Sequence, residues 1–253
     1  MDNLKKEKSL SAYEKAAEEG IDPRCIPQKL TGPVPEHLFD RQMKFLPGRA
    51  CDEYLDGSKR LNFTPDKIPA LKDLSHIFNK TTGWKIARVP GLIHEQDFFA
   101  MLRRKVFPST DYIRGKDELD YTPAPDLFHD MFGHMPLLTD PNFASFYQMF
   151  GEAAFNAKGE DRKKLETFHW FTVEFGLIRK PEGVRVYGAG IISSLGEIQH
   201  ALSDDVKVFD FDPGKIVNQQ YDVWHLQPVL FAIDSFEQLE NGFKDWTKER
   251  RLL

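Results

Sequence analysis

Residues 125–138, PDLFHDMFGHMPLL, constrain this chain most, because they combine an apolar helical pattern with two histidines. His129 and His134 are five residues apart. On an α-helix this spacing places them about 140° apart around the axis and about 7.5 Å apart along it. We therefore expect the helix to end at Gly133, in the left-handed conformation that glycine tolerates, with Pro136 preventing its continuation. That turn would bring both imidazoles to one point, although two histidines alone are weak evidence for a metal.

Glu174 is the only charged side chain in the segment WFTVEFGL, residues 170–177. A carboxylate buried without a partner costs several kcal/mol, so Glu174 needs a cation, a hydrogen-bond network or water. It could pair with one of the 34 lysines and arginines, within a non-catalytic helical binding protein. Alternatively, Glu174, His129 and His134 form the three-ligand face of a non-haem Fe(II) oxygenase. The same three groups could hold the zinc ion of a hydrolase.

Amphipathic patterns along the rest of the chain predict a mostly α-helical fold with a few short β-strands. We expect helices over residues 36–46, 68–83, 95–109, 125–138, 141–157, 161–178 and 193–203, and strands over 84–93 and 183–192. The helix over 68–83 should end at its terminal glycine, and the helix over 95–109 at Pro108. The proline-rich residues 21–36 predict an extended arm that follows a charged tail.

Composition narrows the functional class. The net charge of −5 gives no reason to expect a nucleic-acid partner. The chain has two cysteines and no CxxC motif, which is typical of a reducing compartment. No window approaches the roughly 18 apolar residues of a membrane span. We therefore expect a cytoplasmic protein with no membrane partner.

Three longer motifs carry a family resemblance. YTPAPDLFHDMFGHMPLL, WFTVEFGL and YGAGIISSLGE, in this order, resemble the pterin-dependent aromatic amino acid hydroxylases. The resemblance extends from about Leu38 to Phe236. It implies the family's mostly helical catalytic domain and a monooxygenase that uses Fe(II), a tetrahydropterin and dioxygen. The pterin would be tetrahydrobiopterin or a bacterial analogue, and His129, His134 and Glu174 would be the catalytic iron ligands.

The resemblance also implies a domain organisation. Residues 1–36 would form a tail and arm, and residues 37–253 a single catalytic domain, without a regulatory domain or a tetramerisation tail. A chain without a long heptad tail is expected to be a monomer, with a dimer as the alternative.

Substrate residues follow from the same resemblance. Arg114 would bind the amino acid carboxylate, which suits its planar pair of donors. Asp126 would orient Arg114 and cap the iron helix. The remaining expected substrate residues are Thr122 at the amino acid group, Trp170 and Phe175 as walls of the aromatic pocket, and Ser193, which would also hydrogen-bond an iron-ligand histidine.

The pterin site is also implied by the resemblance. Phe98 would stack on the pterin ring, and the backbone of Gly91, Leu92 and Ile93 would contact the ring edge. Asp130 would reach the pterin through water, with a shorter side chain than the glutamate common in the family. His169 stands where tyrosine is frequent in animal enzymes, and we assign it no role.

Two positions bear on which amino acid is hydroxylated. Trp170 matches the phenylalanine and tyrosine branches of the family. Val223 falls where the tyrosine branch carries an aspartate, and an apolar residue suits a ring without a hydroxyl. We therefore expect the substrate to be phenylalanine and the product tyrosine, with tryptophan and tyrosine as alternative substrates.

Overall fold

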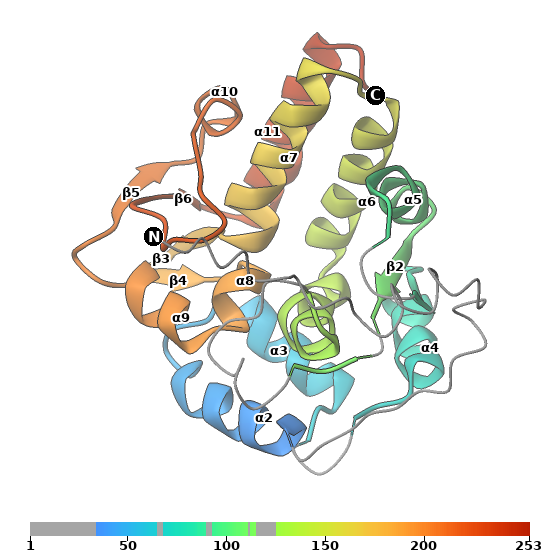
Figure 1. Ribbon diagram of the computed structural model, residues 1–253, viewed down its shortest axis with the longest axis vertical. Helices are drawn as coiled ribbons and strands as arrows, with labels where there is room; N and C mark the ends of the chain where they lie inside the picture. The colour runs from blue at the N-terminus through green and yellow to red at the C-terminus, as the bar shows by residue number, and fades with distance from the viewer. Residues whose placement is uncertain (1–33, 65–67, 90–92, 111, 115–124) are drawn as a thin grey trace, which may run out of the picture.

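The computed structural model describes residues 34–64, 68–89, 93–110, 112–114 and 125–253 (Figure 1). Helix α2 (Val34–Phe45) begins before the expected end of the extended arm, so residues 34–36 are helical. Pro35 lies in its first turn, where the missing N–H of proline breaks no intrahelical hydrogen bond. The rest of the expected tail and arm, residues 1–33, lies outside the described residues.

Helices dominate the described chain, as the sequence patterns predict. They are α3 (Asp52–Leu61), α4 (Leu71–Thr81), α5 (Glu95–Leu102), α6 (Pro141–Asn156), α7 (Glu160–His169), α8 (Ala189–Ile192), α9 (Leu195–Ala201), α10 (Pro213–Ile216) and α11 (Phe236–Glu249). Two π-helices, η3 (His129–His134) and η5 (Trp170–Glu174), and the 3-10 helix η4 (Met135–Thr139) complete the helical elements described. Helix α4 ends as expected, because Gly83 has a φ of 78° and its N–H bonds to the Phe78 carbonyl.

The strands form two small sheets. Strands β1 (Lys85–Arg88) and β2 (Val106–Ser109) pair in parallel. The second sheet has the order β4 (Gly183–Val186), β3 (Leu177–Lys180), β6 (Val229–Ile233) and β5 (Lys207–Asp210). In this sheet β3 and β4 form the antiparallel pair, while β6 runs parallel to β3 and β5.

Two sequence predictions need correction. The helix expected over 95–109 ends at Leu102, because the chain turns through Lys105, with a φ of 57°, and continues as β2. Pro108 lies inside that strand, opposite Ala87, rather than ending a helix. The strand expected over 183–192 covers only 183–186, and α8 follows.

Helices α6, α7 and α11 lie side by side at the top of the molecule (Figure 1). Aromatic rings fill the space between them: the centroid of Phe243 lies 5.1 Å from that of Phe168 and 5.3 Å from that of Phe146. These buried rings fix α7, and therefore also η5, which continues it. No helix of the described residues is long and apolar enough to cross a membrane.

Candidate active site

The two histidines lie on a π-helix, η3, and this corrects the expected turn at Gly133. Gly133 does not have a positive φ. A π-helix bonds residues five apart, so His129 and His134 face the same side without a chain reversal. Gly133 instead permits close packing, because a Cβ there would lie 2.9 Å from the Ala189 carbonyl oxygen of α8. Pro136 also does not stop the helix, which continues as η4 with this proline in its first turn.

Glu174 reaches the same point from the end of η5. The Nε2 atoms of His129 and His134 are 3.0 Å apart. The Glu174 carboxylate oxygens lie 3.2 Å from Nε2 of His134 and 3.5 Å from Nε2 of His129. Two ligands at right angles, each about 2.1 Å from a metal, would be about 3.0 Å apart. The three side chains therefore fit one face of a single metal ion.

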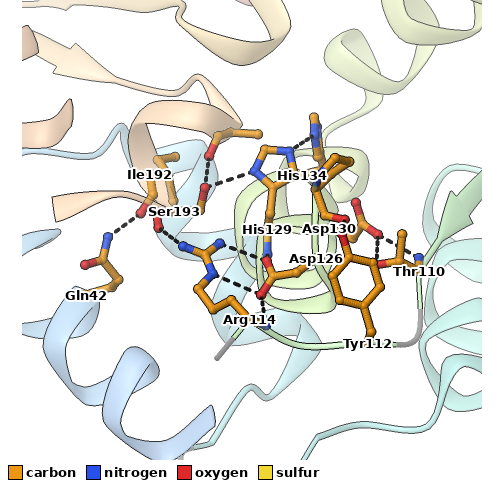
Figure 2. Close-up of polar contacts among 12 residues, drawn as sticks. Gln42, Thr110, Tyr112, Arg114, Asp126, His129, Asp130, His134, Ile192 and Ser193 are labelled. Carbon is orange, nitrogen blue, oxygen red and sulfur yellow. Dashed lines mark hydrogen bonds and ion pairs between the residues drawn. The ribbon is translucent and has the colours of Figure 1, made fainter. Parts of the chain in front are cut away.

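Ser193 fixes the tautomer of His129 (Figure 2). The Ser193 hydroxyl donates to the Ala189 carbonyl at 2.8 Å, so it accepts from Nδ1 of His129 at 3.0 Å. The proton of the neutral imidazole is then on Nδ1, and Nε2 keeps its lone pair toward Glu174 and His134. A hydrogen bond of this kind is what orients metal-ligating histidines in proteins.

Burial and the neighbouring charges set the protonation of the three groups. Burial raises the pKa of Glu174, but His134 and His129 outweigh burial and hold this pKa well below its usual range. Burial lowers the pKa of His129 to about 4 despite the nearby Glu174. For His134 burial again lowers the pKa, but Glu174 outweighs it and raises the pKa overall. The cluster thus presents a carboxylate and a neutral imidazole, which are the forms that bind metals.

Arg114 and Asp126 form a buried, two-pronged ion pair next to the histidines (Figure 2). Nε and Nη2 of Arg114 donate to the two Asp126 oxygens at 2.9 and 2.8 Å. Asp126 also accepts from the backbone N–H of His129 at 2.9 Å, which caps η3 as expected. Burial raises the pKa of Asp126, but the hydrogen bonds and charge of Arg114 lower it overall. Nη1 of Arg114 is directed to the Ser193 carbonyl, at 3.5 Å.

A cavity of about 710 Å³ connects these groups. Its walls include the metal-ligand set, Arg114 and Ser193, and half of the other expected substrate and pterin residues. Of those, the cavity is lined by Trp170, Phe175, Phe98, Ile93 and Asp130. Thr122, Gly91 and Leu92 lie outside the described residues.

Val223 is not placed in the cavity wall as expected. It is 41% exposed, on the segment between α10 and β6, and is not among the residues that line the cavity. From this segment it is Tyr221 that contacts a residue of the cavity wall, because its ring stacks on that of Trp170 with the centroids 4.7 Å apart. The expected contact of Val223 with the substrate ring therefore has no support in this structure.

Asp130 lies on the cavity wall but is tied to the protein (Figure 2). One of its oxygens accepts from the backbone N–H of Thr110 at 2.7 Å and from the Thr110 hydroxyl at 2.9 Å. Burial raises the pKa of Asp130 to about 7, although the hydrogen bonds from Thr110 oppose this. Its other oxygen accepts no hydrogen bond from the described residues.

The cavity is also lined by His169, to which the sequence analysis assigned no role, and by Glu197, which it did not single out. His169 contacts the Tyr147 hydroxyl at 3.2 Å and Glu174 at 3.8 Å. The sequence signal for His169 was that it directly precedes Trp170, an expected residue of the aromatic pocket. Glu197, on α9, could not be recognised as a cavity residue from the sequence, because it stands three residues after Ser194, where a glutamate is expected to be part of a helix cap.

Known proteins resemble this chain in sequence over most of its length. Residues 34–252 match the family described as biopterin-dependent aromatic amino acid hydroxylase. The phenylalanine-4-hydroxylase of Pseudomonas aeruginosa is 42% identical over 202 residues, which cover 80% of this chain and 77% of that protein. The phenylalanine-4-hydroxylase of Chromobacterium violaceum is 44% identical over 204 residues, 80% of this chain and 69% of that protein.

The structural comparison agrees with the sequence comparison. A crystal structure of Chromobacterium violaceum phenylalanine hydroxylase, with bound iron(III) and the oxidised cofactor 7,8-dihydrobiopterin, superposes with a TM-score of 0.87. It covers 96% of this chain and 93% of that chain at 37% sequence identity.

Proposed function

Because the chain belongs to the biopterin-dependent aromatic amino acid hydroxylase family, we propose that it is a phenylalanine 4-monooxygenase. It uses Fe(II), a tetrahydropterin and dioxygen to convert L-phenylalanine to L-tyrosine. The observation that carries this function is the convergence of His129, His134 and Glu174 on one point of a large cavity. The relatives above are phenylalanine hydroxylases, and one of them binds both iron and a pterin.

His129, His134 and Glu174 are the proposed iron ligands. Their donor atoms have the separations of three ligands on one face of an ion, and a facial set leaves room for other ligands on the opposite side. When bound, iron and the reduced pterin supply the activation of dioxygen, which protein side chains do not provide. The role of the chain is to hold these groups and to orient the substrate between them.

Arg114 is the proposed anchor of the substrate carboxylate. Asp126 holds its guanidinium through Nε and Nη2, so the cation is fixed while its Nη1 edge faces the cavity wall at Ser193. Trp170 and Phe175, whose rings are 4.5 Å apart, are the proposed walls for the aromatic ring. Polar anchoring at one end and apolar packing at the other would place the ring toward the metal ligands. Thr122 remains a proposed substrate contact.

The proposed pterin site lies along α5 and the segment before it. Phe98 lines the cavity and offers an aromatic face for stacking, and Ile93 lines the same wall. Asp130 offers one carboxylate oxygen, because Thr110 occupies the other. Gly91 and Leu92 remain proposed backbone contacts to the pterin.

An amino acid panel tests the function. The chain, loaded with ferrous iron and supplied with a tetrahydropterin, is incubated with phenylalanine, tryptophan or tyrosine, and hydroxylated products are scored. We expect tyrosine from phenylalanine as the main product. Preferred hydroxylation of another amino acid would contradict the proposed substrate. Elemental analysis identifies the bound metal. Zinc in place of iron, together with activity that does not depend on the pterin, would contradict the monooxygenase.

Two finer points are part of this proposal. We propose that the chain acts as a monomer, which light scattering on the purified protein tests. We also propose a cytoplasmic location, supported by the buried free thiol of Cys51, which has no disulfide partner in the described residues. Fractionation of cells that express the protein tests this point.

A further inference from the structure

Four carboxylates line the cavity, and three of them have partners within the protein. Glu174 contacts His134 and His129, Asp130 accepts hydrogen bonds from Thr110, and Glu95 pairs with Arg162 at 2.9 Å. The fourth, Glu197, makes no side-chain hydrogen bond or ion pair with any of the described residues. Because a half-buried carboxylate without a partner is unfavourable, Glu197 requires an explanation.

A role in capping α9 does not explain Glu197. In the motif Ser-x-x-Glu, the glutamate side chain would accept from the backbone N–H of the capping serine. Here the N–H of Ser194 donates to the Ile191 carbonyl at 3.1 Å instead. Only half of the motif is present, since the Ser194 hydroxyl accepts from the Glu197 backbone N–H at 3.4 Å. The Glu197 side chain is therefore directed to the cavity rather than to its own helix.

Glu197 shares a cavity wall with the proposed carboxylate anchor. Nη1 of Arg114 is directed to the carbonyl of Ser193, and Ser194 is the next residue and the cap of α9. One helical turn joins Ser194 to Glu197. The lining of the cavity thus includes a cation and a carboxylate that is unpaired within the described part of the chain, and two consecutive serines connect them. An α-amino acid carries the complementary pair of charges on a single carbon.

We propose that the carboxylate of Glu197 binds the α-ammonium group of the amino acid substrate, while Arg114 binds its carboxylate. This inference rests on the proposed function and assigns a residue that determines specificity for amino acids. Burial raises the pKa of Glu197 to about 7, as expected for a carboxylate that has no cation beside it among the described residues. A bound ammonium would supply that cation in a partly desolvated site.

Binding of two matched ligands tests the role of Glu197. L-Phenylalanine carries the ammonium group, and 3-phenylpropanoate has the same ring, chain and carboxylate without it. Their Kd values are measured by anaerobic titration calorimetry on the ferrous protein at pH 8, for wild type and Glu197→Gln. We expect the variant to bind phenylalanine at least about tenfold more weakly and to bind 3-phenylpropanoate as well as wild type does, or better. Glutamine keeps the size of the side chain and removes only its charge.

Glu95→Gln is the matched control, because it removes a second carboxylate of the same cavity, one that already has Arg162 as its partner. We expect the ratio of the two Kd values to be unchanged in Glu95→Gln. An equal change of this ratio in both variants would overturn the inference in favour of a general charge effect. A ratio of Kd values in Glu197→Gln that equals the wild-type ratio would also overturn the inference. If wild type binds no phenylalanine, the proposed function itself is overturned. Circular dichroism establishes that each variant is folded.

Discussion

At the scale of single residues, His129 and Arg114 share one arrangement: the protein fixes each through part of the side chain, and the side chain offers another atom. His129 is held through Nδ1 by Ser193 and offers Nε2. Arg114 is held through Nε and Nη2 by Asp126, which leaves Nη1. Such preorganisation reduces the ordering that binding would otherwise require. Substitutions at these residues should therefore remove binding more than they remove the fold.

The proposed iron ligands give the most direct prediction. His129→Ala, His134→Ala and Glu174→Ala should each retain less than about a tenth of the iron of wild type, because three protein ligands are needed to hold the ion. Iron per chain is measured after reconstitution and desalting, with folding followed by circular dichroism. The control is His225→Ala, which removes an exposed histidine. Wild-type iron content in any of the three variants would exclude that residue from the ligand set.

Arg114→Lys tests the carboxylate anchor. Lysine keeps the charge but loses the planar pair of donors, and it also loses the two-pronged contact with Asp126. A charge-assisted hydrogen bond is worth roughly 1.5–3 kcal/mol, so kcat/KM for phenylalanine should fall by at least about tenfold, mainly through KM. The KM for the pterin should change much less, and Arg179→Lys, at a more exposed position, is the control. Equal losses for both substrates would argue against a specific carboxylate contact.

Glu197 also predicts a pH dependence of stability. Its pKa is about 7 in the folded chain and 4.5 as an ordinary glutamate. Between these pH values the folded chain binds more protons than the unfolded chain, so the free energy of unfolding falls as the pH rises. Glu197→Gln should remove this loss of stability. We expect the loss to be about 1–2 kcal/mol, after a reduction because the side chain is partly exposed to solvent.

Thermal unfolding measures the effect of Glu197→Gln. The variant should melt at the same temperature as wild type near pH 4 and a few degrees higher at pH 8. Glu182→Gln, at an exposed position, should follow wild type at both pH values. A variant that is less stable than wild type at pH 8 would show that the charged form of Glu197 has a partner.

Residue chemistry determined how much of the site the sequence could predict. Glu174 was identifiable because a lone carboxylate in an apolar helix needs a partner. Asp126 was identifiable as a cap, and Arg114 through the family motif. Val223 does not line the cavity in this structure, and its contact with the substrate ring stays a prediction. Sequence could not place it, because the position of a loop residue depends on tertiary contacts such as the stacking of Tyr221 on Trp170.

At the scale of elements, the two π-helices are the features that the sequence patterns did not reveal. The α-helical period of 3.6 residues predicts which face of a segment is apolar, and it does so for η3 and η5 as well. In a π-helix the backbone hydrogen bonds join residues five apart, so the helix is locally wider. This change leaves the apolar pattern nearly unchanged, because apolar residues surround the proposed ligands on every side. The strand β2 was missed for a similar reason, since its four residues follow a helical pattern without a break.

Gly133→Ala tests why glycine stands in η3. Its φ is not positive, so alanine is not excluded by backbone conformation, but the new Cβ would lie 2.9 Å from the Ala189 carbonyl oxygen. Overpacking of this kind costs about 1–3 kcal/mol, which should lower the Tm by several degrees and displace α8 from η3. Gly196→Ala is the matched control, because it is a helical glycine with open space around it. Equal Tm values for the two variants would contradict the packing explanation.

At the scale of the whole molecule, the cavity depends on elements that are far apart in sequence. Its walls come from α5, β2, η3, η5 and the α8–α9 segment. Helix α6 packs against both α5 and α11, and α8 packs against both η3 and η5. The proposed iron ligands join two of these elements, η3 and η5. Iron binding should therefore stabilise the whole fold rather than one loop, since the complete ligand set exists only in the folded chain.

Removal of iron tests this coupling. At a free iron concentration about 100 times the Kd, binding adds about 2.7 kcal/mol to the free energy of unfolding. A change of 1 kcal/mol shifts the Tm of a chain of this size by about 2–4 °C, so chelation should lower the Tm by about 5–10 °C. Calorimetry with and without a chelator measures this shift. Glu174→Ala should melt at one temperature in both conditions, because it lacks a ligand from η5. A wild-type Tm that does not respond to chelation, in protein shown to contain iron, would mean that the metal does not bridge η3 and η5.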